Sequence, residues 1–241
     1  MAAIELTDLT KHYRQGKNVV KALDGVTLSI QSGEFVAVVG RSGSGKTTML
    51  DLLGLLLRPT GGRILIDGVD TGTLGDGERA TMRGERIGFI FQEFNLLPTL
   101  NAVENVMLPL RYRRRKDPDG RARALRLLED VDLADRVEHR PAELSGGQAQ
   151  RVAIARSLIN NPALVLGDEP TGEVDSETST QLIDLMRRMN RERGVTFVIV
   201  THDMEIANRT DRIIRLKDGR VLSDERITAS NGSLAGAPLP T

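Results

Sequence analysis

The chain has 241 residues, enough for one large domain with a smaller part inserted into it. Lys and Arg together number 33, as do Asp and Glu, and this zero net charge argues against a basic nucleic-acid-binding module. The chain has no Cys, which excludes disulfides and Cys-based metal or redox sites and agrees with a cytosolic protein.

The first third of the sequence predicts strands around one glycine-rich loop. Residues 4–9 and 19–30 alternate apolar and polar residues, as strands do, and lack the apolar run of a signal peptide. Residues 35–40 (FVAVVG) form a continuous apolar run, which is typical of a strand buried on both faces. A glycine-rich loop follows, then a predicted helix at 47–57 and predicted strands at 63–68 and 87–91.

Further along the chain, strands first give way to helices and then return. Helical patterns occupy residues 102–111, 120–130 and 145–159. Strands return at 163–168 and 196–203, with a helical pattern at 176–190 between them, and two short strands at 212–217 and 220–225 flank a turn. We therefore expect an α/β fold: a mostly parallel sheet, an N-terminal antiparallel β-subdomain and an inserted α-helical subdomain.

This pattern also sets the expected domain boundaries. We expect a core with its β-subdomain at residues 1–92 and 161–228, and a helical subdomain at residues 93–160. The small, polar tail of residues 229–241 is expected to be disordered. Apolar runs are far shorter than the ~20 residues of a spanning helix, so we expect any membrane role to come through a partner.

Residues 40–48 (GRSGSGKTT) fit the pattern G-x-x-x-x-G-K-[ST] of P-loop NTPases, between a predicted strand and a predicted helix. In such a loop the backbone N–H groups and the helix N-terminus point at the phosphates. We predict that Lys46 reaches the β- and γ-phosphates of ATP and that the Thr47 hydroxyl binds Mg²⁺. The predicted phosphate loop comprises Gly40, Arg41, Ser42, Gly43, Ser44, Gly45, Lys46, Thr47 and Thr48.

Two later strands end in polar residues that we expect at the same edge of the sheet. The run ALVLGDEP ends in two carboxylates, and we predict that Asp168 holds the metal while Glu169 orients or deprotonates the attacking water. His202 lies just past another buried strand and is a candidate γ-phosphate contact. A structural histidine is the alternative at this position.

Two more candidates are weaker on the residues alone. Tyr13 is one of two tyrosines in a chain without Trp, and it could stack on a base, although an ordinary half-buried tyrosine fits nearly as well. Gln92 directly follows a predicted strand and could ligate the metal or a water, or be a plain polar loop residue.

Residues 143–151 (ELSGGQAQR) form a second glycine-rich helix start. Ser145 is a good helix N-cap, but two glycines in the first turn cost about 1 kcal/mol each relative to Ala. Glycines are reasonable there if an anion must approach the helix end closely. Because Lys46 and its loop already hold one nucleotide, we interpret this as a site for a nucleotide bound by another copy of the chain.

Together these motifs resemble ATP-binding-cassette (ABC) ATPases in order and approximate spacing, from about residue 4 to residue 224. LSGGQ combined with the phosphate loop is the diagnostic feature. The resemblance implies that Tyr13 stacks on adenine, that Asp168 and Gln92 belong to the metal site, and that Glu169 is the catalytic base. It also implies catalytic roles for Lys46 and for His202, the switch histidine.

The same resemblance implies a head-to-tail homodimer with two Mg-ATP between the subunits. Asp175 would lie on the loop that communicates between the two sites. The residues that would close over the partner's γ-phosphate are Ser145, Gly146, Gly147 and Gln148.

Residues 89–110 resemble the lipoprotein-release and macrolide-efflux ATPases (LolD- and MacB-like), a subfamily that includes the cell-division ATPase FtsE. This implies an integral membrane permease partner of the MacB, LolC or FtsX type, no nucleic-acid partner, and a peripheral position on the cytoplasmic face of the inner or plasma membrane. Force transmission without transport is an alternative role, and a soluble non-transport ABC ATPase is a less favoured one. Docking to the permease is expected at Phe94, Leu96, Leu97 and Leu100, with a place in the subdomain core as an equal alternative.

Three features depart from the subfamily pattern. Ala149 stands where Gln is frequent. Glu173 and Val174 stand where Asn-Leu is common, and the extra carboxylate near the dimer seam is expected to disfavour closure around ATP. The basic run at 111–116 (RYRRRK) is expected to be a solvated helix end, with an anionic membrane surface as a minority alternative.

Overall fold

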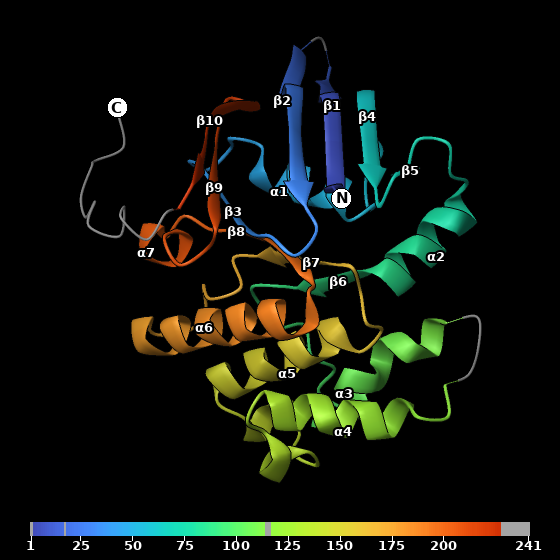
Figure 1. The fold of residues 1–241 in the computed structure, drawn as a ribbon, viewed down its shortest axis with the longest axis vertical. Coiled ribbons are helices and arrows are strands. Elements are labelled where there is room, and N and C mark those ends of the chain that lie inside the picture. The colour runs from blue at the N-terminus through green and yellow to red at the C-terminus, as the bar shows by residue number, and fades with distance from the viewer. Residues whose placement is uncertain (1, 17, 114–116, 228–241) are drawn as a thin grey trace.

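The computed structural model describes residues 2–16, 18–113 and 117–227, which fold around two β-sheets (Figure 1). The first sheet is antiparallel with strand order β2-β1-β4-β5, where the strands are β1 (Ala2–Gln15), β2 (Asn18–Gln31), β4 (Gly61–Ile66) and β5 (Val69–Asp70). The second, central sheet has the order β10-β9-β3-β8-β7-β6. Its strands are β3 (Phe35–Val39), β6 (Ile87–Ile90), β7 (Leu164–Asp168), β8 (Thr196–Val200), β9 (Arg212–Lys217) and β10 (Arg220–Arg226). Strands β6 to β9 and β3 pair in parallel, and β10 closes one edge antiparallel to β9.

Successive side chains of the central strands enter two different apolar clusters, because strand residues alternate between the faces of a sheet. In β3, Phe35 and Ala37 pack on one face, while Val36 and Val38 pack on the other. The second face is covered by helix α1 (Lys46–Leu53) and the antiparallel sheet (Figure 1). The central sheet is therefore buried on both faces, as its apolar strand sequences predict.

Of the remaining helices, α3 to α7 lie on the first face (Figure 1), whereas α2 packs through Met82 against the cluster of the second face. Their bounds are α2 (Asp76–Arg86), α3 (Ala102–Met107), α4 (Gly120–Asp130), α5 (Gly146–Leu158), α6 (Ser176–Arg193) and α7 (Met204–Ala207), with short 3₁₀ turns η1 (Leu108–Tyr112), η2 (Ala134–Arg136) and η3 (Pro141–Glu143). Apolar residues of α3, α4 and α5 belong to the same cluster as those of α6 and β3. The expected fold class is confirmed: an α/β core with an antiparallel N-terminal sheet and an inserted group of helices.

Three helices differ from the expectation, and the first is the helix predicted at 47–57, which as α1 already ends at Leu53. The predicted helix at 102–111 is α-helical only to Met107 and continues as the 3₁₀ turn η1, where Pro109 lacks the N–H that an α-helix needs. Helix α2 was not expected, because it lacks an apolar stripe. The residue that it buries is Arg79, whose guanidinium donates to the carbonyl oxygens of Leu55 and Leu57. Hydrogen bonds of this kind leave no periodic apolar signal in the sequence.

Parts of the sequence interpretation fall outside the described residues. These parts are the tail at 229–241 and residues 114–116 of the basic run. Across 2–16, 18–113 and 117–227, the structure contains no helix with the length and apolar character that a membrane span requires.

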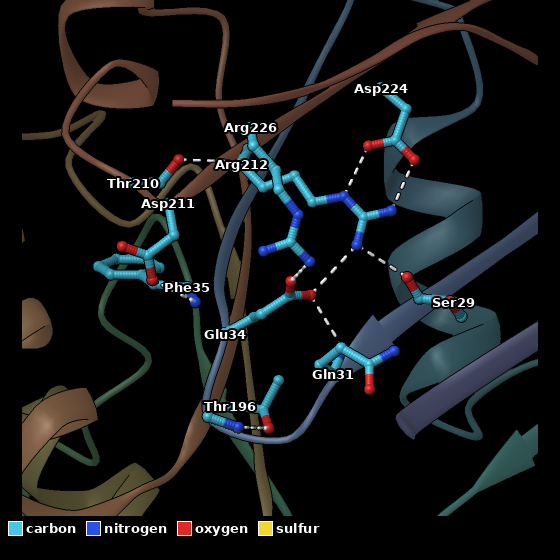
Figure 2. A network of polar contacts seen from close by, with 11 residues as sticks. Ser29, Gln31, Glu34, Phe35, Thr196, Thr210, Asp211, Arg212, Asp224 and Arg226 are labelled. Atoms are coloured by element: carbon cyan, nitrogen blue, oxygen red, sulfur yellow. Dashed lines mark hydrogen bonds and ion pairs between the residues drawn. The ribbon is translucent and has the colours of Figure 1, made fainter. Parts of the chain in front are cut away.

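A polar network joins the last two strands to the turn before β3 (Figure 2). The nearly buried Arg212 donates two hydrogen bonds of 2.6 Å to the Asp224 carboxylate, one of 2.8 Å to the Ser29 carbonyl oxygen and one of 3.1 Å to Glu34. Arg226 reaches the other oxygen of Glu34 at 2.7 Å. This network fixes β9 and β10 beside β3, and β9 in turn forms one wall of the site described below.

Arg212→Ala is expected to lower the free energy of unfolding by about 2 kcal/mol, because two carboxylates and a carbonyl lose their shared donor. Urea unfolding of the nucleotide-free protein measures this loss. Arg226→Ala is the matched control: its side chain is 68% exposed, so its removal is expected to cost less than about 1 kcal/mol. Equal losses in the two variants would contradict the assigned role of Arg212.

Candidate functional site

A cavity of about 990 Å³ opens where β3, β7 and β8 end. The complete predicted phosphate loop, residues 40–48, lines it. The structure brings the other nucleotide-site candidates to the same cavity, although they come from distant parts of the chain: Tyr13, Gln92, Asp168, Glu169 and His202. The roles assigned to these residues stay predictions, but their convergence on one cavity agrees with a common site.

The loop needs glycine at two positions. Gly45 has a left-handed backbone (φ 102°), and a Cβ there would lie 2.3 Å from the Ala22 carbonyl oxygen. A Cβ on Gly40 would lie 2.4 Å from the Leu216 carbonyl oxygen. The loop therefore packs directly against the backbone of β2 and β9, and this packing places the N-terminus of α1 at the cavity.

Lys46 and Ser44 give the loop its anion-binding groups. The Lys46 ammonium donates to the carbonyl oxygens of Gly40 and Arg41, at 2.8 and 3.2 Å, and lies folded over the loop. The Ser44 hydroxyl is buried, and no described residue hydrogen-bonds to it. A buried donor without a protein partner fits a loop whose donors serve a phosphate.

Two adjacent carboxylates, Asp168 and Glu169, line the cavity. Burial raises the pKa of Asp168, and the neighbouring charges of Glu169 and Asp51 raise it further, while Lys46 opposes the change. Burial also raises the pKa of Asp51. Such a concentration of negative charge favours a cation at this point.

Asp168→Asn is expected to raise the unfolding temperature of the nucleotide-free protein by about 2–4 °C at pH 7, because it removes one of these repelling charges. The same change should remove the additional stabilisation that Mg²⁺ gives to the ATP-bound protein. Thermal unfolding with ATP alone and with ATP and Mg²⁺ measures both effects. A variant less stable than wild type without nucleotide would contradict the electrostatic explanation.

Glu169 and His202 form a pair at the mouth of the cavity. Their side chains are joined by a hydrogen bond of 2.6 Å between His202 Nδ1 and Glu169 Oε2. Glu169 has a left-handed backbone (φ 47°), which is uncommon for a residue with a side chain, whereas the His202 side chain is 76% exposed. The pair places a carboxylate and an imidazole beside the phosphate loop.

Oxygen donors for a metal are present in the same cavity. Thr47, Asp168 and Gln92 offer a hydroxyl, a carboxylate and an amide oxygen, which is the donor chemistry that Mg²⁺ prefers. The amide nitrogen of Gln92 donates to the Glu173 carboxylate at 2.9 Å, and the amide oxygen is the atom with which Gln92 would bind a metal. The donor set fits Mg²⁺ that arrives with a nucleotide.

A second cavity, of about 530 Å³, lies at the N-terminus of α5. Ser145 caps the helix by accepting a hydrogen bond from the backbone N–H of Gln148. A Cβ on Gly147 would lie 2.7 Å from a Thr178 methyl group, so a larger residue here would have to displace the Thr178 side chain. Among the described residues, the two cavities have no lining residue in common. The predicted LSGGQ residues and Asp175 all line the second cavity. The full lining is Asp132, Leu133, Ser145, Gly146, Gly147, Gln148, Arg151, Glu173, Val174, Asp175, Thr178 and Gln181.

Asp175 lies in this second cavity as the N-cap of α6. It accepts hydrogen bonds from the Thr178 N–H at 2.9 Å and from the Thr178 hydroxyl at 2.7 Å. These bonds hold the pKa of Asp175 below its usual range. The cap fixes the loop of Glu173 and Val174 against the start of α5.

The residues after Gln92 divide between surface and core. Leu97 is 42% exposed, Leu96 packs against the large apolar cluster, and Phe94 and Leu100 are half-buried. Ala149 is buried within α5. Of the four residues expected to dock the permease, Leu97 is exposed at the surface, and the other three are at least half-buried in the helical part.

Sequence reasoning missed several residues that support the site. Arg156 is almost fully buried, and its guanidinium donates to the carbonyl oxygens of Phe94 and Asn95. Burial lowers the pKa of Arg156 to about 10. Arg215 and Leu222 line the first cavity, because the pairing of β9 with β3 brings Arg215 opposite Val39. No local sequence pattern predicts these contacts, because Arg156 and Arg215 each lie far along the chain from these partners.

Comparison with known proteins identifies the family. The sequence profile described as "ABC transporter" matches residues 23–172. The chain belongs to the ABC transporter family. This membership confirms the family, the fold class and the ATPase class expected from the sequence.

Individual ABC proteins match nearly the whole chain. It is 48% identical over 233 residues to the macrolide export ATP-binding/permease protein MacB of Rhodopirellula baltica, which covers 94% of this chain and 34% of MacB. It is 47% identical to an uncharacterized ABC transporter ATP-binding protein, MJ0796, of Methanocaldococcus jannaschii, covering 93% of this chain and 97% of MJ0796. The chain therefore spans about a third of one relative and almost all of the other.

The solved ABC cassettes have the same fold. A dimeric structure of MJ0796 superposes with a TM-score of 0.85 at 47% identity, covering 93% of this chain and 99% of that one. A second dimeric MJ0796 structure, described as a post-hydrolysis state bound to ADP and Pi, gives a TM-score of 0.84 at 46% identity, with the same coverage.

Proposed function

We propose that this chain hydrolyses ATP as one half of a head-to-tail homodimer, with two Mg-ATP held between the copies. The observation that carries the proposal is the presence of two separate anion-binding features in one chain. The phosphate loop lines one cavity and the LSGGQ helix start lines another, and none of the residues that the structure describes lines both. A second copy, turned head to tail, can bring the LSGGQ end of one chain to the nucleotide of the other. The two MJ0796 structures are described as dimeric, which supports a dimer.

In this proposal the first cavity performs the chemistry. Tyr13 stacks on the adenine, while Lys46 and the loop N–H groups hold the β- and γ-phosphates. Mg²⁺, when bound by Thr47, Asp168 and Gln92, neutralises phosphate charge. Glu169 Oε2 accepts a proton from the attacking water, as the water oxygen bonds to the γ-phosphorus and the bond to the β–γ bridging oxygen breaks. His202 holds the Glu169 carboxylate and contacts the γ-phosphate.

We further propose that the dimer drives a separate integral membrane permease from the cytoplasmic face of the membrane. The MacB relatives support this, since their names combine an ATP-binding part with a permease and this chain spans only 31–34% of their length. An efflux or lipoprotein-release partner of the MacB or LolC type is favoured. An FtsX-type partner that transmits force without transport is the alternative.

The proposal assigns separate tasks to the expected parts of the chain. The core at residues 1–92 and 161–228 binds and hydrolyses the nucleotide, and the helical part at residues 93–160 contacts the permease and the partner's nucleotide. Leu97 is the exposed apolar residue from which docking would begin. A half-buried Phe94 lies near the start of α5, within contact distance of a Cβ placed on Gly146.

The experiment is a tagged pull-down from gently solubilised native membranes, followed by mass spectrometry. We expect a permease with few spanning helices and a large extracytoplasmic domain, and Leu97→Glu should reduce its recovery. Leu125→Glu, at another exposed leucine of the helical part, is the matched control. Recovery of ribosomes or nucleic acid without a membrane protein would contradict the transporter assignment.

A further inference from the structure

The hydrogen bond between Gln92 and Glu173 connects the two cavities within one chain. Gln92 lines the nucleotide cavity and Glu173 lines the cavity at the LSGGQ helix. The Gln92 amide nitrogen donates to Glu173 Oε1 at 2.9 Å. A change at either cavity that moves one of these side chains therefore affects the other cavity.

The backbone around this contact is held on both sides. A Cβ on Gly172 would lie 3.2 Å from the Gln92 amide nitrogen, so the amide packs directly on the Gly172 backbone. Beyond Gln92, Phe94 and Asn95 have left-handed backbones (φ 54° and 49°), and Arg156 binds both carbonyl oxygens. The side chains of Gln92 and Glu173 are themselves exposed, so a change in their contact does not require the buried core to rearrange.

The Glu173 backbone lies beside the LSGGQ glycines, and Glu173 lines the same cavity as they do. The Glu173 carbonyl oxygen lies 3.7 Å from the position of a Cβ on Gly146. The N-terminus of α5 attracts anions, and Asp175 on the same loop is committed to capping α6. A triphosphate that arrives at this helix end meets the Glu173 carboxylate, and two negative groups at short range repel each other.

We propose that Glu173 is a charge-operated latch on Gln92, an inference that rests on the head-to-tail dimer proposed above. In the open protein Glu173 holds the Gln92 amide. The nucleotide of the partner subunit displaces the Glu173 carboxylate as it reaches Ser145 and Gly147, and this frees the Gln92 amide to turn toward the metal site of its own chain. Each site thereby detects whether its neighbour is filled.

The latch opposes closure, so removing its charge should favour the ATP-bound dimer. In a Glu169→Gln background, which keeps ATP intact, adding Glu173→Gln or Glu173→Ala should lower the ATP concentration for half-maximal dimerisation about threefold to tenfold. Static light scattering across an ATP titration measures this midpoint. Glu177→Gln is the matched control, because Glu177 is an exposed carboxylate in the first turn of α6 that does not line the cavity.

A second readout tests the hydrogen bond itself in nucleotide-free protein. The side-chain amide resonances of Gln92, assigned by their loss in Gln92→Ala, should shift in Glu173→Ala. They should shift less in Glu173→Gln, whose amide oxygen still accepts the bond, and stay in place in Glu177→Gln. This measurement needs neither metal nor turnover.

The outcomes separate the latch from the proposed dimer. If the Glu169→Gln background dimerises with ATP but the Glu173 variants have the same midpoint, the latch is overturned and the dimer stands. If Gln92 resonances do not respond to Glu173→Ala, the latch is likewise overturned. A background that stays monomeric with ATP overturns the dimer and the latch together.

Discussion

Glu169→Gln is expected to reduce ATP turnover about a thousandfold while leaving ATP binding intact, since positioned general bases contribute roughly 10²–10⁴ in rate. The amide keeps the size of the side chain and can still pair with His202 Nδ1, which lies 2.6 Å from Glu169 Oε2. It cannot accept the proton of the attacking water. Phosphate release measures turnover, and a fluorescent ATP analogue measures binding.

Glu205→Gln controls for the loss of a nearby carboxylate. Glu205 is exposed in the first turn of α7, close in sequence to His202, and it does not line the nucleotide cavity. We expect this variant to turn over ATP at the wild-type rate. Substantial activity in Glu169→Gln would show that another group takes the proton, and would contradict the role proposed for Glu169.

Lys46→Ala is expected to weaken ATP binding by about 3 kcal/mol, more than a hundredfold in Kd, because the phosphates lose a charge-assisted donor. The Lys46 ammonium already lies against the loop, donating to Gly40 and Arg41, so little rearrangement is needed to reach a phosphate. Calorimetric titration of ATP into the nucleotide-free protein measures the change.

Two comparisons make this result specific. The unfolding temperature without nucleotide should stay within a few degrees of wild type, which shows that the loop still folds. Lys21→Ala removes a cation at the exposed rim of the same cavity, where Lys21 pairs with Asp24, and should change the affinity much less. Equal losses in both variants would mean that Lys46 acts only through overall charge.

The fold was largely predictable because its central strands are buried on both faces. The apolar runs around Phe35, Val165 and Phe197 appear as strands β3, β7 and β8, which pair in parallel. The glycine loop was also predictable, because a Cβ on Gly40 or Gly45 would clash with the backbone of a neighbouring strand. In both cases the physical requirement acts on a short, continuous stretch of sequence.

Other features could not be read from the sequence, because they depend on contacts between distant segments. Helix α2 buries Arg79 rather than an apolar stripe, so its pattern resembles a polar loop. The hydrogen bond from Gln92 to Glu173 joins residues 81 positions apart. The sequence marked Glu173 as a departure from the family pattern that is expected to disfavour closure around ATP, and the structure supplies its hydrogen-bond partner, Gln92.

The most direct test of the central claim is the mass of Glu169→Gln in solution, measured by light scattering without and with ATP. The shared nucleotide site predicts a monomer near 26.4 kDa without ATP and twice that mass with ATP. The ATP-induced doubling should disappear in a second variant that also carries Ser145→Arg, which blocks the LSGGQ helix end. A protein that stays monomeric with ATP, while the wild type hydrolyses ATP at a normal rate, would contradict the account.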